Sequence, residues 1–263
     1  MPSAGTNAPR AALLFGASGL VGGYCLERLL LDDAFGRVVV VVRRSLGRSH
    51  RKLEERVVDF AHIADAELPP CDDAFICLGT TIAKAGSETA FRKVDHDAVV
   101  AATALARRSG VRRLALVSSV GASVDSESFY LRVKGETERD AAAAGPFETL
   151  AIVRPSLLLG ARPERRLGEG LGQVVGGPLA PLFVGPVARY RPVHARVVAF
   201  AMIAAVLQGA RGTHIHEYSD IAALGQTLLP VGATIERAPS VRVGLALLSA
   251  TLVVAAIAWL IAR

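Results

Sequence analysis

Residues 11–22 read AALLFGASGLVG and decide the fold of this chain. The first five residues form an apolar run typical of a buried strand, and glycines at 16, 19 and 22 follow where a helical pattern over 20–31 begins. Glycines in a strand-turn-helix let the backbone approach a pyrophosphate, while free N–H groups and the positive end of the helix dipole bind its charge. We therefore predict that this turn binds a dinucleotide.

Apolar runs and helical patterns alternate along the following residues. Strands are predicted over 38–42, 57–60, 74–78, 114–117 and 150–153, and helices over 20–31, 88–108 and 130–144. Strands rich in Val, Leu and Ile, separated by helices, are what a parallel sheet covered on both faces requires. The predicted fold class is α/β, a doubly wound Rossmann sheet with helices on both faces.

The end of the second predicted strand favours one cofactor over another. Arg43 and Arg44 stand where an NAD site usually has an acid for the ribose 2′-hydroxyl. Two guanidiniums suit a 2′-phosphate instead, so NADP(H) is predicted ahead of NAD, although Arg48 or Arg51 could contribute in their place.

Asp59 is expected to end the third strand and to accept from the adenine amino group. Leu78, Gly79 and Thr80 end the fourth and would run beside the cofactor.

Tyr130 and Lys134 are four residues apart, which places both side chains on one face of a helix. A fixed positive charge favours the ionised form of a phenol, so the pair forms a candidate acid/base. The lysine is informative because the chain contains only four Lys, and nearly all other basic residues are Arg. Ser119 could hydrogen-bond the same substrate oxygen.

Bulk properties exclude several classes of protein. With 263 residues, 51% of them hydrophobic and 21% charged, the chain suits one α/β domain over 11–235 and does not suit wholesale disorder. The net charge of +6 comes without a nucleic-acid-binding signature, so no nucleic-acid partner is expected.

Three cysteines without Cys-x-x-Cys spacing indicate core thiols of a reducing compartment. His214 and His216 lack a suitably spaced third ligand, so no metal is predicted. Residues 1–10 are expected to be a flexible end.

The C-terminal part follows a different pattern. A small substrate lobe is predicted over about 156–235, within which the Gly- and Pro-rich stretch 168–185 either caps a substrate pocket or is a packed irregular connection.

Residues 243–262 carry no charge and contain the single tryptophan, Trp259. An apolar helix of this length just crosses a bilayer, so 241–262 is predicted to be a transmembrane anchor, with a helix buried in a homodimer interface as the alternative. Arg237 and Arg242 favour a cytoplasmic main domain.

The chain resembles the short-chain dehydrogenase/reductase superfamily, and within it the atypical branch that includes the Tat-interacting proteins. The resemblance covers about 11–225 and is carried, beyond the glycine turn, by residues 77–81 (CLGTT), 84–86 (KAG), 91–95 (FRKVD), 117–122 (VSSVGA), 130–136 (YLRVKGE), 154–159 (RPSLLL) and 221–225 (IAALG).

This resemblance implies roles for individual residues. Tyr130 would be the acid/base, Lys134 would favour its ionised form and hold the nicotinamide ribose, and Ser119 would orient the substrate carbonyl. Pro155 would lie beside the nicotinamide. Because Ser119 precedes Tyr130 by only eleven residues, Ser118 is a rival for its role. The implied cofactor-binding residues are Gly16, Ala17, Ser18, Gly19, Leu20, Val21, Arg43, Arg44, Asp59, Leu78, Gly79, Thr80, Ser118, Tyr130, Lys134 and Pro155.

Two functions follow as hypotheses. The first is an NADP(H)-dependent oxidoreductase that acts on a small carbonyl-type substrate, for which a lipophilic compound is one candidate, and that is tethered to a membrane through its C-terminal helix. The second is a binding protein in which NADP(H) is a structural or sensory ligand, and in which the partner is another protein or the membrane.

Overall fold

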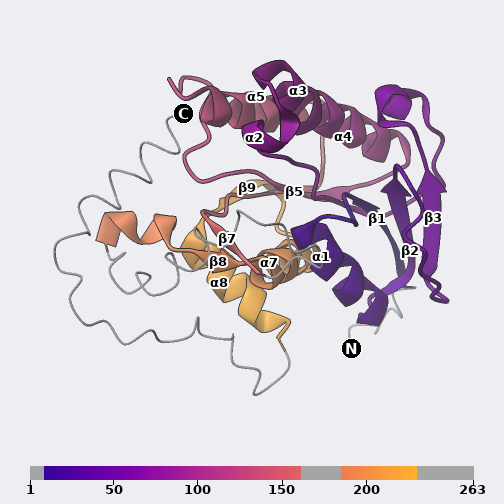
Figure 1. The fold of residues 1–263 in the computed structure, drawn as a ribbon. Coiled ribbons are helices and arrows are strands. Elements are labelled where there is room, and N and C mark those ends of the chain that lie inside the picture. The colour runs from indigo at the N-terminus through magenta and orange to yellow at the C-terminus, as the bar shows by residue number, and fades with distance from the viewer. Residues whose placement is uncertain (1–8, 161–184, 230–263) are drawn as a thin grey trace.

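A computed structural model describes residues 9–160 and 185–229 of the chain. Its centre is a seven-stranded sheet in the order β3-β2-β1-β4-β5-β6-β9, and all neighbouring strands in it are parallel (Figure 1). The strands are β1 Arg10–Phe15, β2 Phe35–Val42, β3 Leu53–Val57, β4 Asp73–Ile76, β5 Arg113–Val117, β6 Thr149–Val153 and β9 Gly212–His216.

Helices cover both faces of the sheet, as predicted. Helices α1 (Leu20–Leu31), α7 (Ala195–Gln208) and α8 (Tyr218–Thr227) lie on one face, and α3 (Glu88–Arg92), α4 (Ala98–Arg108) and α5 (Phe129–Ala143) lie on the other (Figure 1). The sheet has a hydrophobic core on each face, and successive residues of β1 point into different cores. Leu14 packs with α1 and α7, whereas Leu13 packs with α4. The doubly wound fold is therefore confirmed.

Strand β2 has the apolar sequence that is typical of a strand in a parallel sheet. The five valines of Val38–Val42 are at most 4% exposed, so this strand is buried on both faces. A strand with one face in water would alternate apolar and polar residues, and this one does not.

Short elements connect the larger ones. They are η1 Phe60–Asp65, α2 Ile82–Ala85, the π-helical turn η2 Lys93–Asp97, η4 Gly185–Tyr190, and the strands β7 Leu158–Leu159 and β8 Val193–His194, which pair with each other in a separate small sheet.

The third predicted strand was wrong. The sequence indicated 57–60, but β3 ends at Val57, and Asp59 instead accepts a hydrogen bond from the backbone N–H of Ala61 at the start of η1. Among the described strands β3 lies at the edge of the sheet and pairs only with β2, and it carries Glu54, Glu55 and Arg56. An edge strand does not need the apolar run on which the prediction depended.

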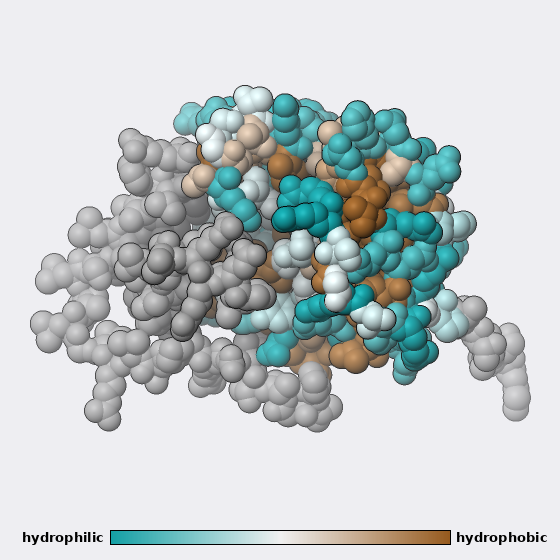
Figure 2. All heavy atoms as spheres, turned by 45° about the vertical axis from the view of Figure 1, so that its right-hand side comes forward, coloured by the Kyte–Doolittle hydropathy of each residue, from teal (hydrophilic) through white to brown (hydrophobic). Residues whose placement is uncertain are grey.

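Figure 2 shows a largely hydrophilic face interrupted by small apolar patches. Large apolar side chains that are more than a third exposed are Leu31, Val57, Val94, Val124, Leu157 and Ile215, which come from separate elements and loops.

The predicted membrane anchor over 241–262 lies outside the described residues, as does most of 168–185. Among the helices within 9–160 and 185–229, none is both long and apolar enough to cross a bilayer.

Candidate functional site

The glycine turn is built on close backbone contacts. Gly16 has φ +82°, and a Cβ there would lie 2.5 Å from the carbonyl oxygen of Cys77. The N–H of Gly19 donates to the carbonyl oxygen of Gly16 at 2.9 Å. A Cβ at Gly22 would lie 2.0 Å from that same oxygen. Gly16 and Gly22 are therefore required by packing of the turn against β4 and α1.

The N-terminus of α1 faces solvent. Gly19 is its N-cap, no side chain among the described residues accepts from the first-turn N–H groups, and that turn carries no acidic residue. Ser18 and Gly19 are exposed, Leu20 is half-buried, and Ala17 and Val21 are buried in the core. An uncapped N-terminus next to a tight glycine turn fits the charge and shape of a pyrophosphate.

Arg43 and Arg44 follow the end of β2 and are exposed. Because β1 and β2 pair with Phe15 opposite Val41, these arginines emerge beside the glycine turn. Among the described residues neither guanidinium takes part in an ion pair, whereas Arg48 lies 3.8 Å from Glu27. The donor set at this corner is thus suited to an additional phosphate.

The end of β4 contributes backbone. Leu78 is buried, Gly79 is exposed, and the N–H of Thr80 donates to Oδ2 of Asp95 at 2.7 Å. A Cβ on Gly79 would lie 3.3 Å from Oδ1 of Asp95 and 3.8 Å from Nζ of Lys134. This edge therefore lies directly against Lys134.

Lys134 is buried within α5, and its Nζ lies 2.6 Å from Oδ1 of Asp95. Burial acts to lower the pKa of Lys134, but Asp95, Tyr130 and Glu138 outweigh it, so that the pKa is raised. The lysine is therefore an ammonium at neutral pH.

Tyr130 occupies the preceding turn of α5, on the same side as Lys134, and is half-buried. Its ring packs on Phe91 of α3, with ring centroids 5.4 Å apart and planes inclined by 41°. The four-residue spacing of Tyr130 and Lys134 predicted one shared helix face, and the structure has both residues on α5, where Tyr130 is one of the groups that raise the pKa of Lys134.

The two candidate serines differ. The Oγ of Ser118 is buried and makes no hydrogen bond within the described part of the chain. Ser119 is half-buried, and its hydroxyl donates to the carbonyl oxygen of Val120 over a long 3.4 Å. Pro155 is buried after β6, and its carbonyl oxygen accepts from the N–H of Val120. Both serines remain candidates for binding a substrate oxygen.

These residues share one edge of the sheet. In a parallel sheet all carboxyl ends lie at the same edge, and the strand order reverses between β1 and β4. Ligands of such folds bind at this switch point. The glycine turn after β1 and Leu78–Thr80 after β4 border it. Asp59 lies two residues beyond the end of β3, and its carboxylate already caps η1.

Sequence reasoning missed two charged contacts. Asp95 was noted only as part of the 91–95 resemblance, and nothing in the sequence marked it as the partner of Lys134, which lies on another helix. Glu138 of α5 binds Arg154, the residue after β6, through two hydrogen bonds. Glu138 and Arg154 are 16 residues apart in the sequence, so no local spacing marked them as partners.

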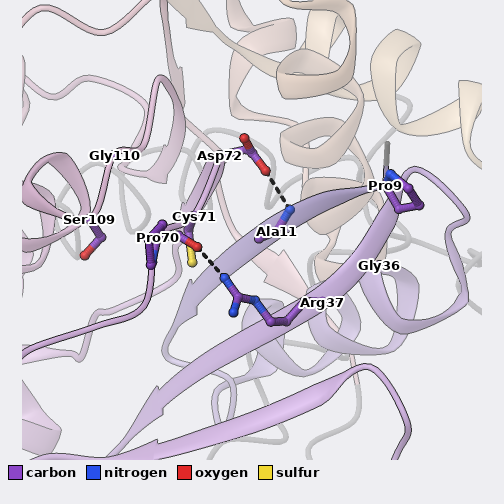
Figure 3. A pocket seen from close by; sticks show the side chains of 9 residues that line it. All are labelled: Pro9, Ala11, Gly36, Arg37, Pro70, Cys71, Asp72, Ser109 and Gly110. Atoms are coloured by element: carbon purple, nitrogen blue, oxygen red, sulfur yellow. Dashed lines mark hydrogen bonds between the residues drawn. The ribbon is translucent and has the colours of Figure 1, made fainter. Parts of the chain in front are cut away.

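A cavity of about 440 Å³ lies at the opposite, amino-terminal edge of the sheet (Figure 3). Its polar groups are already bonded to the protein, since Arg37 donates to the carbonyl oxygen of Pro70 and Asp72 accepts from the N–H of Ala11. Cys71 donates to the carbonyl oxygen of Pro69, and burial raises the pKa of its thiol to about 11. Nothing in this cavity resembles the predicted dinucleotide site.

His214 and His216 stack on each other with centroids 6.4 Å apart. The part of the chain that the structure describes contains no group of three His, Cys, Asp or Glu side chains able to hold a metal ion.

The sequence of this chain is similar to those of several known proteins. No family model matches the chain. Protein HTATIP2 of Rattus norvegicus is 36% identical over 176 residues, which are 65% of this chain and 72% of the rat protein. Protein FMP52, mitochondrial, of Eremothecium gossypii is 37% identical over 160 residues, which are 60% of this chain and 71% of the fungal protein.

Solved structures share the fold at low identity. MoeE5 in complex with UDP-glucose and NAD superimposes with a TM-score of 0.59 at 19% identity, covering 83% of this chain and 81% of that chain. The UDP-Glc/GlcNAc 4-epimerase from Campylobacter jejuni gives a TM-score of 0.56 at 15% identity, covering 81% and 82%. At these identities the likeness concerns the fold alone.

Proposed function

Because the chain belongs to the family of the HTATIP2 and FMP52 proteins, we propose that it is an NADP(H)-dependent oxidoreductase that transfers hydride to or from a carbonyl-type substrate. The observation that carries this proposal is the Tyr130 and Lys134 pair on α5, with Lys134 against the end of β4 and the glycine turn on the neighbouring strand. Acid/base chemistry and dinucleotide binding are thereby combined at one sheet edge.

The residues at this edge fit the cofactor. In this proposal the backbone of Gly16–Leu20 binds the pyrophosphate, and Arg43 and Arg44 bind the 2′-phosphate with charge-assisted hydrogen bonds. Support comes from the uncapped N-terminus of α1 and the lack of ion pairs at both arginines among the described residues. The bound nicotinamide would supply or accept the hydride.

The chain's own side chains would handle the proton. In the reductive direction the Oη of Tyr130 donates its proton to the substrate oxygen, and the charge left on the phenol is stabilised by the Lys134 ammonium. Phe91 restrains the phenol ring by packing on it. Ser118 or Ser119 would donate a hydrogen bond to the same substrate oxygen, and the buried Ser118 hydroxyl has the greater need of a partner.

One observation favours a second function. The Lys134 ammonium is already paired with Asp95 at 2.6 Å, which weakens the field it exerts on Tyr130. A chain with this pair would bind NADP(H) and turn over slowly, as a cofactor-dependent regulator would.

Two measurements on the purified chain separate these functions. Calorimetry with NADPH and NADH tests binding, and equal affinities would refute recognition of the 2′-phosphate. Consumption of NADPH is then followed against a panel of aldehydes, ketones and quinones. Turnover supports the oxidoreductase, whereas tight NADPH binding without turnover on any carbonyl supports the regulator.

Attachment to a membrane through 241–262 is a separate part of the proposal. Carbonate extraction of membranes from cells that express the full chain, beside a truncation at Pro239, tests it. The full chain should stay with the membrane while the truncated chain is released, and release of both would exclude a spanning anchor.

A further inference from the structure

Two residues of the α3–η2 segment contact two residues of α5, on the face of the sheet that these helices cover. Phe91 and Asp95 lie four positions apart on the segment formed by α3 and η2, and Tyr130 and Lys134 lie four positions apart on α5. Phe91 packs on the ring of Tyr130, and Asp95 pairs with the ammonium of Lys134. Each member of the proposed acid/base pair thus has its own partner on one neighbouring segment.

Asp95 is held from three directions and is fully buried. Its Oδ1 lies 2.6 Å from Nζ of Lys134, and its Oδ2 accepts from the N–H of Thr80 at 2.7 Å. Its own carbonyl oxygen accepts from the hydroxyl of Thr137, one turn after Lys134 on α5, at 2.9 Å. One carboxylate therefore joins the end of β4 to α5.

The backbone around Asp95 is unusual in the same place. The helix predicted over 88–108 is interrupted by η2, a π-helical turn at Lys93–Asp97 with Asp95 at its centre. Such turns add a residue to a helix and are frequent at functional sites. Here the turn directs one buried acid toward Lys134 while α4 continues to pack on the sheet.

We propose that Asp95 is a positioning residue of the proposed active site, whose carboxylate keeps the Lys134 ammonium charged and fixed beside the dinucleotide-binding end of β4. Its placement toward the reaction rests on the proposed function. Its action on Lys134 is a property of the protein without ligand.

The electrostatics give the proposal a distinctive consequence. Within the described residues, the titratable groups that face Lys134 are Asp95 from η2 together with Tyr130 and Glu138 from α5, while the end of β4 offers only backbone at Gly79. Burial opposes the charge of Lys134, and Asp95 is the largest of the contributions that outweigh it. Without the Asp95 charge, the largest contribution that opposes burial is lost, so the lysine should release its proton at lower pH than in the wild type.

Lysine NMR measures this directly, because the chain has only four lysines, Lys52, Lys84, Lys93 and Lys134. The full chain is labelled with [13Cε]lysine, the resonance of Lys134 is assigned with Lys134→Arg, and the pH is titrated without cofactor. In the wild type the Lys134 resonance should keep its ammonium shift beyond the ordinary lysine value of 10.5. In Asp95→Asn it should titrate at clearly lower pH than in the wild type.

Asp97→Asn is the matched control. It removes an exposed carboxylate of the same turn that pairs with His96 and is not among the groups that shift the pKa of Lys134, so it should leave the Lys134 titration unchanged. Asp95→Glu, which keeps the charge, should restore part of the wild-type behaviour. A purely structural role for Asp95 would lower stability without moving the titration.

The outcomes are decisive even if Asp95→Asn does not fold. A wild-type Lys134 that titrates clearly below 10.5 overturns the proposal by itself, and so does an Asp95→Asn protein whose Lys134 titrates like the wild type. The NMR result does not depend on dinucleotide binding. Failure of NADPH to bind would therefore refute the proposed function while leaving the control of Lys134 by Asp95 intact.

Discussion

Glu138 and Arg154 join helix α5 to the end of β6 through two hydrogen bonds between one carboxylate and one guanidinium, at 2.9 and 2.5 Å. Their side chains are only 7% and 17% exposed. Replacing Glu138 with Gln leaves Arg154 charged and largely buried, so we expect a loss of about 3 kcal/mol in the free energy of unfolding, measured by urea denaturation.

The control for this pair is Glu148→Gln, which breaks the exposed contact with Arg112 at 3.6 Å. We expect that substitution to cost less than about 1 kcal/mol. A double substitution, Glu138→Gln with Arg154→Met, should cost less than the sum of its single changes. Equal costs for the buried and the exposed pair would contradict the assigned role of Glu138.

Adjacent glycines of α1 should respond in opposite ways to alanine. A Cβ at Gly22 meets the Gly16 carbonyl oxygen at 2.0 Å, whereas at Gly23 its nearest neighbour is the Ala17 carbonyl oxygen at 3.8 Å. We expect Gly22→Ala to cost about 2 kcal/mol or more, because backbone must move. Gly23→Ala should be neutral or should stabilise by up to about 1 kcal/mol, as expected for a helix interior. Thermal unfolding of both variants measures the contrast, which similar melting temperatures would refute.

The two arginines after β2 should affect one cofactor and not the other. If both bind a 2′-phosphate, Arg43→Ala with Arg44→Ala should weaken NADPH binding by about tenfold to a hundredfold and leave NADH binding unchanged. Calorimetry with each dinucleotide measures this. Arg211→Ala, an exposed arginine just before β9, is the control and should change neither affinity. A parallel loss for both dinucleotides would assign the arginines to something other than the 2′-phosphate.

Removing the hydroxyl of Tyr130 should separate binding from chemistry. Tyr130→Phe keeps the ring that packs on Phe91, so the fold and NADPH affinity should be retained. Turnover with any carbonyl substrate found in the panel should fall by about a hundredfold to ten-thousandfold, the usual contribution of a general acid. Single-turnover rates after mixing with NADPH measure this step. Unchanged turnover in the variant would remove Tyr130 from the mechanism.

The surface carboxylate of Asp140 should give a stability difference confined to one pH range. Hydrogen bonds from Arg139 and then His96 lower the pKa of Asp140 to about 2. Since the pKa is depressed, the contribution is fully present above the ordinary value of 3.8 and is lost as the pH falls through about 2. Asp140→Asn should therefore lower the urea midpoint slightly at pH 6, and this difference should shrink toward zero as the pH is lowered to about 2 and below. Asp125→Asn, in an exposed loop, serves as the control.

Sequence periodicity predicted most of the sheet and its helices. α1 was predicted at its observed bounds, and the strands around it were placed to within three residues because they are buried on both faces. β3 was misplaced because an edge strand pairs on one side only. α8 was missed although 221–225 had been singled out. Gly225 of α8 allows close approach to Val197 of α7, and a contact between two separate helices leaves no periodic signal in the sequence of either.

The same distinction between local patterns and contacts of distant sequence positions applies to the candidate site. The glycine turn and the spacing of Tyr130 and Lys134 are local patterns, so they could be read from the chain. The partner of Lys134 could not, because Asp95 reaches it only through a π-turn and the packing of two helices. The roles predicted for the site residues remain predictions until ligand binding is measured.

The last strand of the sheet has a consequence for how the chain is made. β9 pairs with β6 from far along the sequence, with Gly212 opposite Thr149. Until residues 212–216 leave the ribosome, β6 is an open edge of buried apolar residues with unsatisfied N–H and C=O groups. Non-local parallel pairing is also slow. A nascent chain that stalls before β9 therefore exposes a template for self-association, and a chaperone that covers this edge would raise the yield of folded protein.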